Sequence, residues 1–362
     1  MIDISMKKVS IIGTVGIPAK YGGFETLTEY LTKLLAEEFE LTVFCSSKSY
    51  PDKTKTYNGA QLKYIPLQAN GVQSIPYDII SIFKALFFAD TLLILGVSGC
   101  IILPIVRLFS KKKLVVNIDG LEWKREKWGG FAKWFLKFSE KIAVKNAHVI
   151  VTDNKVIQDY VLLEYKTKTQ LIAYGGDHVQ REKISAELIS SFSFLNEKYC
   201  FKVCRIEPEN NVKMILDAFS ILPNQIIVII GNWNNSEYGQ KLKDNYSDFS
   251  NIFLMNPIYN QQTLNQIRSN CYLYIHGHSA GGTNPSLVEA MYLELPILAF
   301  GVKYNRETTE HQAMYFENTI ELKELLLSTN KQALTKNGIT MRKIADRRYT
   351  WVEISKKYRD LF

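Results

Sequence analysis

The sequence predicts an α/β protein made of two doubly wound halves, each a parallel sheet covered by helices. Apolar runs typical of buried strands alternate along the chain with runs of helical periodicity, as in parallel sheets with helical crossovers. The chain has 362 residues, more than one compact core usually holds, so two domains are expected. A hydrophobic fraction of 46% is sufficient for well-buried cores.

The first half should begin with a buried strand at residues 9–12, a glycine loop and an amphipathic helix at 23–38. Strand-like runs then repeat the pattern at 41–45, 92–95, 113–118 and 149–152. The glycines of Tyr174-Gly175-Gly176-Asp177 suit a hinge between domains. We therefore place the first domain at residues 1–177.

A second series of strands and helices begins near Tyr199 and predicts a second domain at residues 178–345. Strands are expected at 201–203, 226–230, 252–254, 272–275 and 297–299, with helices at 212–222 and 285–294. Doubly wound folds bind ligands at the carboxyl ends of their strands, and the glycine loops of both halves follow strands. Ligand sites are therefore expected in these loops.

The charge balance favours an anionic partner. Lys and Arg number 44 against 36 Asp and Glu, which gives a net charge of +8, and the pI is near 9.0. A nucleotide-sugar, a phospholipid surface or a nucleic acid would satisfy this balance.

Cysteine usage and the first residues indicate a cytoplasmic protein. The five cysteines include no C-x-x-C pair, so reduced, buried thiols are expected. Residues 1–8 are polar and charged and show no secretory signal. The apolar run at 91–106 is broken by glycines and Pro104, and it is shorter than the roughly 20 residues of a spanning helix. A buried strand, a glycine turn and a buried helix are expected there.

The stretch from Ile275 to Met291 is the strongest candidate site. A short strand runs into a Gly-Gly turn, and Asn284-Pro285 then provides a favoured helix start. The backbone amides of Gly282, Thr283 and Asn284 would face a guest at that helix end, where the dipole favours an anion such as a phosphate. Glu289, one turn further, would accept hydrogen bonds from sugar hydroxyls, so a nucleotide is expected. The alternative is an ordinary strand-turn-helix with a surface glutamate.

A first glycine loop, Gly13 to Glu25, follows the first strand. It lacks the G-x-G-x-x-G spacing of dinucleotide sites and forms a wider loop. Such a loop suits a sugar or lipid-phosphate acceptor, whereas glycines that serve only turn geometry are the alternative. The acceptor-binding candidates in and beside this loop are Gly16, Tyr21, Gly22, Gly23 and Glu25.

The chain resembles the family-4 retaining glycosyltransferases of GT-B fold, and among them the bacterial polysaccharide rhamnosyltransferases that use dTDP-rhamnose. The resemblance rests on segments that span nearly the whole chain in the expected order. These are G-x-x-G-x-P-x-x-Y-G-G-F-E at 13–25, Asn117 to Arg125, Tyr174 to Asp177, H-S-A-G-G-T-N-P-S-L-V-E-A at 278–290, and Tyr349-Thr350-Trp351.

This resemblance implies two Rossmann-like domains facing a cleft. The first would bind the acceptor and the second the nucleotide-sugar, and a C-terminal helix at 346–362 would cross back to pack on the first domain. It implies a retaining, metal-independent hexosyltransferase without a cofactor. The donor would be dTDP-L-rhamnose, and the acceptor a lipid-diphosphate-linked saccharide of capsule, O-antigen or cell-wall synthesis. The enzyme would then lie at the inner face of the plasma membrane, and no nucleic acid is expected as a partner. A UDP-glucose or GDP-mannose transferase, a sugar-nucleotide epimerase and a non-catalytic assembly partner remain alternatives.

Two residues carry over from the family's donor site. Glu289 matches the second Glu of the E-x7-E motif, which holds the ribose, and Arg205 matches the arginine that binds the diphosphate. The first Glu of that motif would fall at Gly281, and the usual lysine is replaced by Asn210. We therefore expect the amides of residues 282–284 to carry more of the phosphate load.

Other polar residues have two interpretations each. Asp119, at a strand end, is a candidate acceptor-side base or orienting residue, or a turn residue before Gly120. Glu122 is the alternative carboxylate. His278 would touch the donor phosphate or sugar, or pack the loop. His276 and His278 suggest a metal pair, but Glu289 is the one carboxylate near them and the chain has no D-x-D, so no metal site is expected.

The segment from Trp123 to Ala147 carries an aromatic stripe at helical spacing, beside a row of lysines. The stripe is Phe131, Trp134, Phe135, Phe138 and Ile142, and the lysines are Lys133, Lys137, Lys141 and Lys145. Such a helix can lie on an anionic membrane, with Lys124, Arg125 and Lys127 as a basic rim. More commonly, an aromatic stripe of this kind packs on the sheet.

Overall fold

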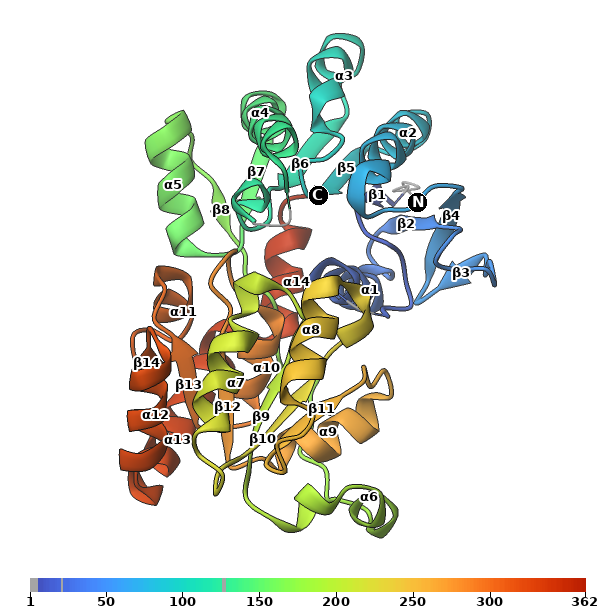
Figure 1. Cartoon of the computed structure of the whole chain (residues 1–362). Helices are drawn as coiled ribbons and strands as arrows, with labels where there is room; N and C mark the ends of the chain where they lie inside the picture. The colour runs from blue at the N-terminus through green and yellow to red at the C-terminus, as the bar shows by residue number, and fades with distance from the viewer. Residues whose placement is uncertain (1–5, 21, 126–127) are drawn as a thin grey trace. The chain divides into compact units, whose positions relative to one another are not determined.

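A computed structural model describes residues 6–20, 22–125 and 128–362. The chain divides into two compact units, Met1–Tyr174 with Trp351–Phe362, and Gly175–Thr350 (Figure 1). Each unit is built on a parallel sheet flanked by helices, so the predicted fold class is confirmed. The division falls between Tyr174 and Gly175, and the last helix belongs to the first unit.

The sheet of the first unit has the strand order β3-β4-β2-β1-β5-β6-β7-β8. Its central strand is β1, which pairs in parallel with β2 on one side and with β5 on the other. The chain reverses direction across the sheet there, so the loop after β1 lies at a topological switch point. The strands are β1 (Lys8–Ile12), β2 (Glu40–Ser46), β3 (Thr56–Tyr57), β4 (Ala60–Ile65), β5 (Thr91–Leu95), β6 (Lys113–Asn117), β7 (Val149–Thr152) and β8 (Gln170–Leu171).

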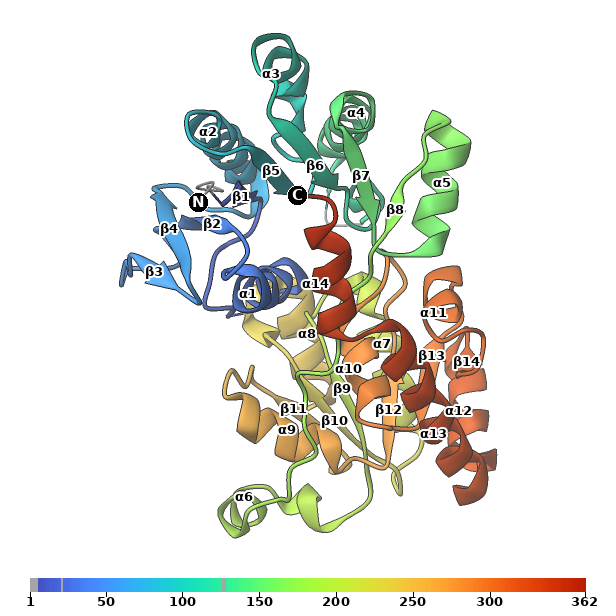
Figure 2. The same ribbon diagram turned by 180° about the vertical axis from the view of Figure 1, so that it is seen from behind.

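The helices of the first unit cover both faces of this sheet. Figures 1 and 2 show α2, α3 and α4 along one face, with α1 and α14 on the opposite face. The helices are α1 (Gly23–Leu35), α2 (Ser74–Leu86), α3 (Leu103–Phe109), α4 (Gly130–Asn146), α5 (Lys155–Tyr165) and α14 (Trp351–Arg359). Short 3₁₀ turns occur at Gly71–Gln73, Cys100–Ile102 and Glu122–Lys124.

The C-terminal helix α14 is an integral part of the first unit. Trp351 stacks on Tyr30 of α1 with ring centroids 4.5 Å apart. Further along, the buried Tyr358 hydroxyl accepts a hydrogen bond from Asn117 Nδ2 at 2.8 Å. The motif Tyr349-Thr350-Trp351 therefore contains the point where the chain returns to the first unit.

The sheet of the second unit has the order β11-β10-β9-β12-β13-β14, and every pair in it is parallel. Its strands are β9 (Tyr199–Val203), β10 (Ile226–Ile230), β11 (Ile252–Met255), β12 (Leu273–His276), β13 (Ile297–Phe300) and β14 (Met314–Phe316). From β9 the chain moves outward to β10 and β11, then returns to β12 on the other side of β9. The switch point therefore lies between the ends of β9 and β12.

Helices cover both faces of the second sheet, and one buried cluster joins α7, α8 and α12 to it. The helices are α6 (Ala186–Ser191), α7 (Val212–Ser220), α8 (Glu237–Tyr246), α9 (Gln261–Ser269), α10 (Pro285–Tyr292), α11 (Lys303–Thr308), α12 (Thr319–Ser328) and α13 (Lys331–Arg348). Short 3₁₀ turns occur at Ser193–Asn196, Pro208–Asn210 and Trp233–Asn235. Helix α13 packs against α10.

The Gly-Gly segment at the start of the second unit is closely packed. A Cβ atom added at Gly176 would lie 2.7 Å from the carbonyl oxygen of Val288 in α10. The Gly176 amide also donates to the Tyr349 carbonyl at 2.8 Å. The glycine is therefore required for a close approach to α10, which the hinge interpretation did not include.

The apolar run from Thr91 follows the predicted sequence of strand, turn and helix, but the helix is not buried. Leu103 and Val106 of α3 face the core, whereas Ile105, Leu108 and Phe109 are exposed. The expectation of a buried helix was therefore wrong for the face of α3 that carries Ile105, Leu108 and Phe109. Among the residues that the structure describes, no helix is both long and apolar enough to cross a membrane.

Three residues of the aromatic stripe of α4 do not pack on the sheet, so the expectation was wrong for them. Phe131, Trp134 and Phe138 are exposed, and Trp134 stacks on Phe138 with ring centroids 5.6 Å apart. The helix is buried instead through Leu136, Ser139, Glu140, Ala143 and Val144. Burial of Glu140 is possible because its carboxylate accepts hydrogen bonds from Trp123, Tyr160 and Tyr165.

Candidate functional site

Two loops of the second unit meet at its switch point. One follows β9 and contains Arg205 and Asn210, and the other follows β12 and leads into α10. Because β9 and β12 are neighbours in the sheet, their carboxyl ends place these loops side by side.

Hydrogen bonds tie the two loops together. The Ser279 amide and hydroxyl both donate to the Glu209 carbonyl, at 2.8 and 3.0 Å. Asn211 Nδ2 donates to the Gly277 carbonyl at 2.8 Å. Since backbone carbonyls accept all three hydrogen bonds, the loops form one preorganised unit, as a binding site requires.

The N-terminus of α10 has the predicted cap. Asn284 Oδ1 accepts from the Ser286 amide at 3.0 Å, and Pro285 is the first helical residue. Gly281 before it has a φ of 112°, which a residue with a side chain rarely adopts. A residue with a side chain would therefore be strained at position 281.

His278 lies between the two positions at which the chain departs from the family pattern. Its Nδ1 is 3.1 Å from Asn210 Oδ1, and a Cβ atom added at Gly281 would lie 3.2 Å from its Nε2. The imidazole is buried. The backbone carbonyl of His278 accepts a hydrogen bond from Asn305 Nδ2 at 2.8 Å. His278 therefore links the two loops through Asn210, and its ring lies close to Gly281.

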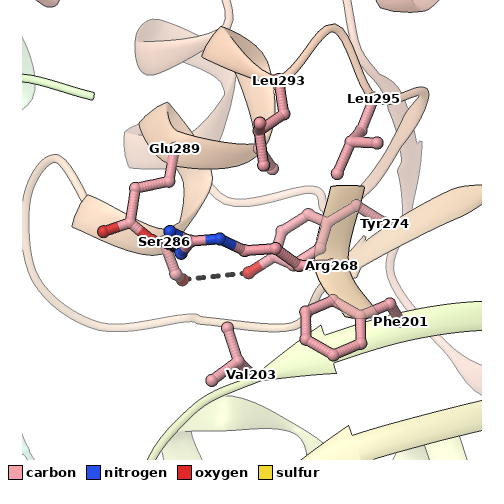
Figure 3. A pocket seen from close by; sticks show the side chains of 9 residues that line it. Phe201, Val203, Arg268, Tyr274, Ser286, Glu289, Leu293 and Leu295 are labelled. Atoms are coloured by element: carbon pink, nitrogen blue, oxygen red, sulfur yellow. Dashed lines mark hydrogen bonds and ion pairs between the residues drawn. The ribbon is translucent and has the colours of Figure 1, made fainter. Parts of the chain in front are cut away.

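Glu289 takes part in an interaction that sequence reasoning missed. Its Oε2 is 2.6 Å from Arg268 NH1, and its Oε1 is 3.1 Å from His178 Nε2. Figure 3 shows Arg268 extended toward Glu289 in a small pocket that β9, β12 and α10 also line. Burial raises the pKa of Glu289, but Arg268 and His178 outweigh it and hold the pKa below its ordinary value. No local motif marks Arg268, because it comes from α9 and meets Glu289 through the fold.

The same pocket contains a second polar contact. The Tyr274 hydroxyl donates to Ser286 Oγ at 3.0 Å, and Ser286 Oγ donates to Asn284 Oδ1 at 2.8 Å. A strand residue thereby supports the cap of α10.

Arg205 lies at the end of β9 and is exposed. Among the described parts of the chain, no side chain or carbonyl binds its guanidinium group, although its own carbonyl accepts a hydrogen bond from Asn210 Nδ2 at 2.9 Å. The guanidinium is therefore available to a ligand at the edge of the switch point.

In the first unit, the glycine loop is closed by Glu25. The carboxylate is buried, and Oε1 accepts from the Val15 amide at 3.4 Å. A Cβ atom at Gly22 would lie 1.9 Å from Glu25 Oε2, so a glycine is required there. Gly16 is buried against Tyr50, and Gly23 begins α1. Tyr21 lies outside the described residues.

Asp119 and Glu122 follow β6 and are held differently. Glu122 is bound by Arg125 Nε at 2.8 Å and by Trp128 Nε1 at 3.1 Å. Asp119 has a φ of 60° and is half-buried, and its amide donates to Asn117 Oδ1. Burial and then the nearby Asp119 raise the pKa of Tyr174 well above its ordinary value, which places these two groups close together. Lys127, expected in the basic rim, lies outside the described residues.

Among the described residues, no group of three or more His, Cys, Asp and Glu side chains could hold a metal ion. His276 and His278 lie in one loop with ring centroids 6.1 Å apart, but no carboxylate completes a site with them.

Two family models match the chain. Residues 184–334 match the model described as "Glycosyl transferases group 1". Residues 6–177 match a model described as "Domain of unknown function (DUF1972)". The two matched ranges correspond to the two units of the fold.

Solved structures share the fold over nearly the whole chain at low sequence identity. A sucrose-phosphate synthase from Thermosynechococcus elongatus has a TM-score of 0.79 at 13% identity, with 98% of each chain covered. HepE of Anabaena, solved in complex with UDP and glucose, has a TM-score of 0.75 at 14% identity, also with 98% of each chain covered. A putative UDP-N-acetylglucosamine 2-epimerase from Listeria monocytogenes has a lower TM-score of 0.61 at 14% identity, covering 97% of this chain and 94% of that one.

The fold, the similar solved structures and the matched family model all indicate the same class of protein. The chain has the two Rossmann-like domains of GT-B glycosyltransferases, and these findings support a sugar transferase with a group 1 glycosyltransferase domain in residues 184–334.

Proposed function

We propose that this protein is a retaining, metal-independent glycosyltransferase that binds its nucleotide-sugar at the switch point of the second unit. The observation that carries the proposal is the meeting of the Arg205 loop with the capped N-terminus of α10. Backbone amides and a helix dipole favour a diphosphate there, with Arg205 available beside them. Glu289 lies one turn into the same helix, where it would accept hydrogen bonds from the ribose.

The chemistry follows from the leaving group. Breaking a glycosyl–phosphate bond develops negative charge on the departing diphosphate. Preorganised amides of residues 282–284 and the Arg205 guanidinium would stabilise that charge and lower the barrier by about 3–4 kcal/mol per well-placed donor. Asp119 is our candidate for orienting or deprotonating the acceptor hydroxyl.

For the finer identity, we propose dTDP-L-rhamnose as donor and a lipid-diphosphate-linked saccharide as acceptor. The support is the resemblance of segments 13–25, 117–125 and 278–290 to rhamnosyltransferases of polysaccharide synthesis. HepE binds UDP and glucose in its crystal structure, so a UDP-sugar is the first alternative donor.

A surface of the first unit supports contact with a membrane. Helices α3 and α4 pack side by side and expose six large apolar side chains. These are Ile105, Leu108, Phe109, Phe131, Trp134 and Phe138, here called the α3–α4 surface. Phe109 is 81% exposed and Phe131 is 79% exposed. Patches of this kind mark interaction sites.

Basic residues on the same two helices indicate the sign of the partner. Arg107, Lys111 and Lys141 are exposed on or beside α3 and α4, and Lys133 is half-buried. Aromatic side chains among cations suit an anionic lipid surface, which would also present a lipid-linked acceptor.

Membrane contact can be tested by vesicle flotation. The double variant Phe109→Ser/Trp134→Ser should lose at least about tenfold in partitioning onto phosphatidylglycerol vesicles, because it removes two exposed aromatic side chains that would enter the lipid. The matched control, Ile320→Ser/Leu327→Ser, removes two exposed apolar side chains of α12 and should bind like the unaltered protein. Equal binding of both variants would remove the α3–α4 surface from the proposal.

Donor assays test the reaction itself. Incubation with dTDP-rhamnose, UDP-glucose or GDP-mannose, with and without a lipid-linked saccharide, should release nucleoside diphosphate from dTDP-rhamnose and form a glycosylated lipid. Activity with GDP-mannose alone would contradict the donor assignment. The shared fold with an epimerase makes that activity the second candidate, and conversion of the sugar without an acceptor would favour it.

A further inference from the structure

We propose that the Lys202 ammonium group binds the diphosphate of the nucleotide held at the α10 end, an inference that rests on the proposed function. Lys202 belongs to β9, the central strand at the switch point, and is only 1% exposed. A lysine that is buried in an apolar strand is rare unless its charge has a partner.

The side chain runs along the strand toward the two loops of the site. The Lys202 backbone is level with Ile229 of β10, one residue before the end of β9. A Cβ atom added at Gly277, the first residue after β12, would lie 3.2 Å from Lys202 Nζ. The same added atom would lie 2.3 Å from the Asn210 carbonyl oxygen. Nζ therefore lies at the carboxyl ends of β9 and β12, beside the backbone of both loops.

The ammonium group has no partner within the described part of the protein. No hydrogen bond or ion pair to Nζ occurs there, and burial lowers the pKa of Lys202. The Glu209 carboxylate in the adjacent loop is buried but forms no ion pair with it. A buried, uncompensated charge destabilises the protein, so its presence calls for an anion from outside.

A second buried group at the same place is also unpartnered. His276 ends β12, is 2% exposed, and its Nε2 has no hydrogen-bond partner. Burial and then the neighbouring Lys202 hold the pKa of His276 well below its ordinary value. Within the described residues, the strand ends of β9 and β12 thus each carry one buried polar group without a hydrogen-bond partner.

The loop beside Lys202 carries Asn210, whose side chain is occupied with His278 and with the Arg205 carbonyl. Lys202 Nζ approaches this loop from the strand beneath it. The strand lysine would therefore add a cation to the loop.

The test compares ligand binding with unliganded stability in Lys202→Met. Removing an unpartnered buried charge should leave the melting temperature of the free protein unchanged or higher. The Kd for dTDP should rise about 10- to 100-fold, the range for loss of one hydrogen bond to a charged group. If Lys202 had only a structural role, its replacement would lower the melting temperature, and dTDP affinity would not fall while stability was kept.

Three probes and a control separate the sources of the effect. Calorimetric titration with thymidine should give the same Kd in both proteins, whereas dTDP and inorganic pyrophosphate should both bind more weakly to the variant. Lys213→Met removes an exposed lysine of α7 and should match the unaltered protein. Lys202→Gln is the second variant in case Lys202→Met does not fold.

The outcomes distinguish this inference from the function on which it rests. Unchanged dTDP affinity in both Lys202 variants overturns the role of Lys202 alone. Failure of the unaltered protein to bind any nucleoside diphosphate overturns the proposed function together with it.

Discussion

The two glycine loops of this protein both follow the carboxyl end of a parallel strand but are built differently. In the loop after β12, hydrogen bonds to the loop after β9 hold the chain, and that neighbouring loop carries the exposed Arg205. In the loop after β1, the Glu25 carboxylate turns inward and accepts from the Val15 amide. Nearby, Glu122 is bound by Arg125 and Trp128.

The second unit therefore offers evidence for ligand binding, whereas the first unit offers evidence for a fixed loop conformation. The second unit presents donors for an anion, as a nucleotide site requires. In the first unit, Glu25 and Glu122 have internal partners, so we expect these two carboxylates to stabilise the conformation of their loops. The following predictions test this contrast, beginning with the largest effect.

Loss of Glu289 should have the largest effect, because it leaves Arg268 buried without its ion pair. Glu289→Ala should lower the free energy of unfolding by about 3–5 kcal/mol and abolish transfer. Urea denaturation and a donor assay measure the two effects.

The double variant Arg268→Met/Glu289→Leu separates stability from binding. It should recover most of the stability, since apolar groups replace the pair, and remain inactive because the ribose contact is absent. Recovery of both would show that Glu289 serves only the ion pair.

Arg205→Ala should lower the transfer rate by about 10²- to 10³-fold, the cost of removing one donor to developing charge. Its side chain is exposed and forms no hydrogen bond or ion pair with the described residues, so the melting temperature should stay the same. Arg205→Lys is the matched control and should keep part of the activity. An active Arg205→Ala enzyme would move the diphosphate away from this loop.

His276 should make the second unit sensitive to acid. Its pKa is held well below the ordinary value by burial and by Lys202, so the folded protein resists a proton that the unfolded chain accepts near pH 6.5. Stability is therefore full above pH 6.5 and falls below it by up to about 1.4 kcal/mol per pH unit.

Denaturation midpoints between pH 7 and pH 5 measure this slope. His276→Phe should flatten it, whereas His311→Phe, at an exposed position, should not. An unchanged slope in His276→Phe would show that another group titrates.

Glu122→Gln should have the smallest effect. The variant keeps an acceptor for Trp128 but weakens the pair with Arg125, for a loss of about 1 kcal/mol of stability. Transfer activity should stay within about tenfold. A much larger loss of activity without unfolding would identify Glu122 as the acceptor-side carboxylate.

Much of the fold could be predicted from local patterns. The strands β7 and β10 have the predicted bounds, because each is a short apolar run between polar turns. The start of α10 was predicted by Asn284-Pro285 for the same local reason. Helix α1 ends at Leu35 rather than at residue 38, since helix ends depend on local hydrogen bonds that the periodicity does not specify.

Other features depend on the whole fold or on an overlooked turn. The hairpin of β3 and β4 turns at Asn58-Gly59, a favoured hairpin pair with positive φ at both residues. The α4 stripe was expected to pack on the sheet, but three of its residues are exposed. Helical spacing identifies a face of a helix without showing what covers it. Burial of Glu140 depends on three hydroxyl and indole donors from elsewhere.

The partners in the candidate site show the same limit. Arg268 and His178 reach Glu289 from α9 and from the segment before α6, so no spacing rule links them. Lys202 did have a sequence signal, because it is a charged residue within an apolar strand. Only its burial and its approach to Gly277 make it a candidate site residue.

A crystal structure of the protein with dTDP tests the central claim most directly. We predict that phosphate oxygens lie within about 3.2 Å of the amide nitrogens of residues 282–284, with Arg205 in contact with the diphosphate. A nucleotide bound with its phosphates away from the α10 end would contradict the account.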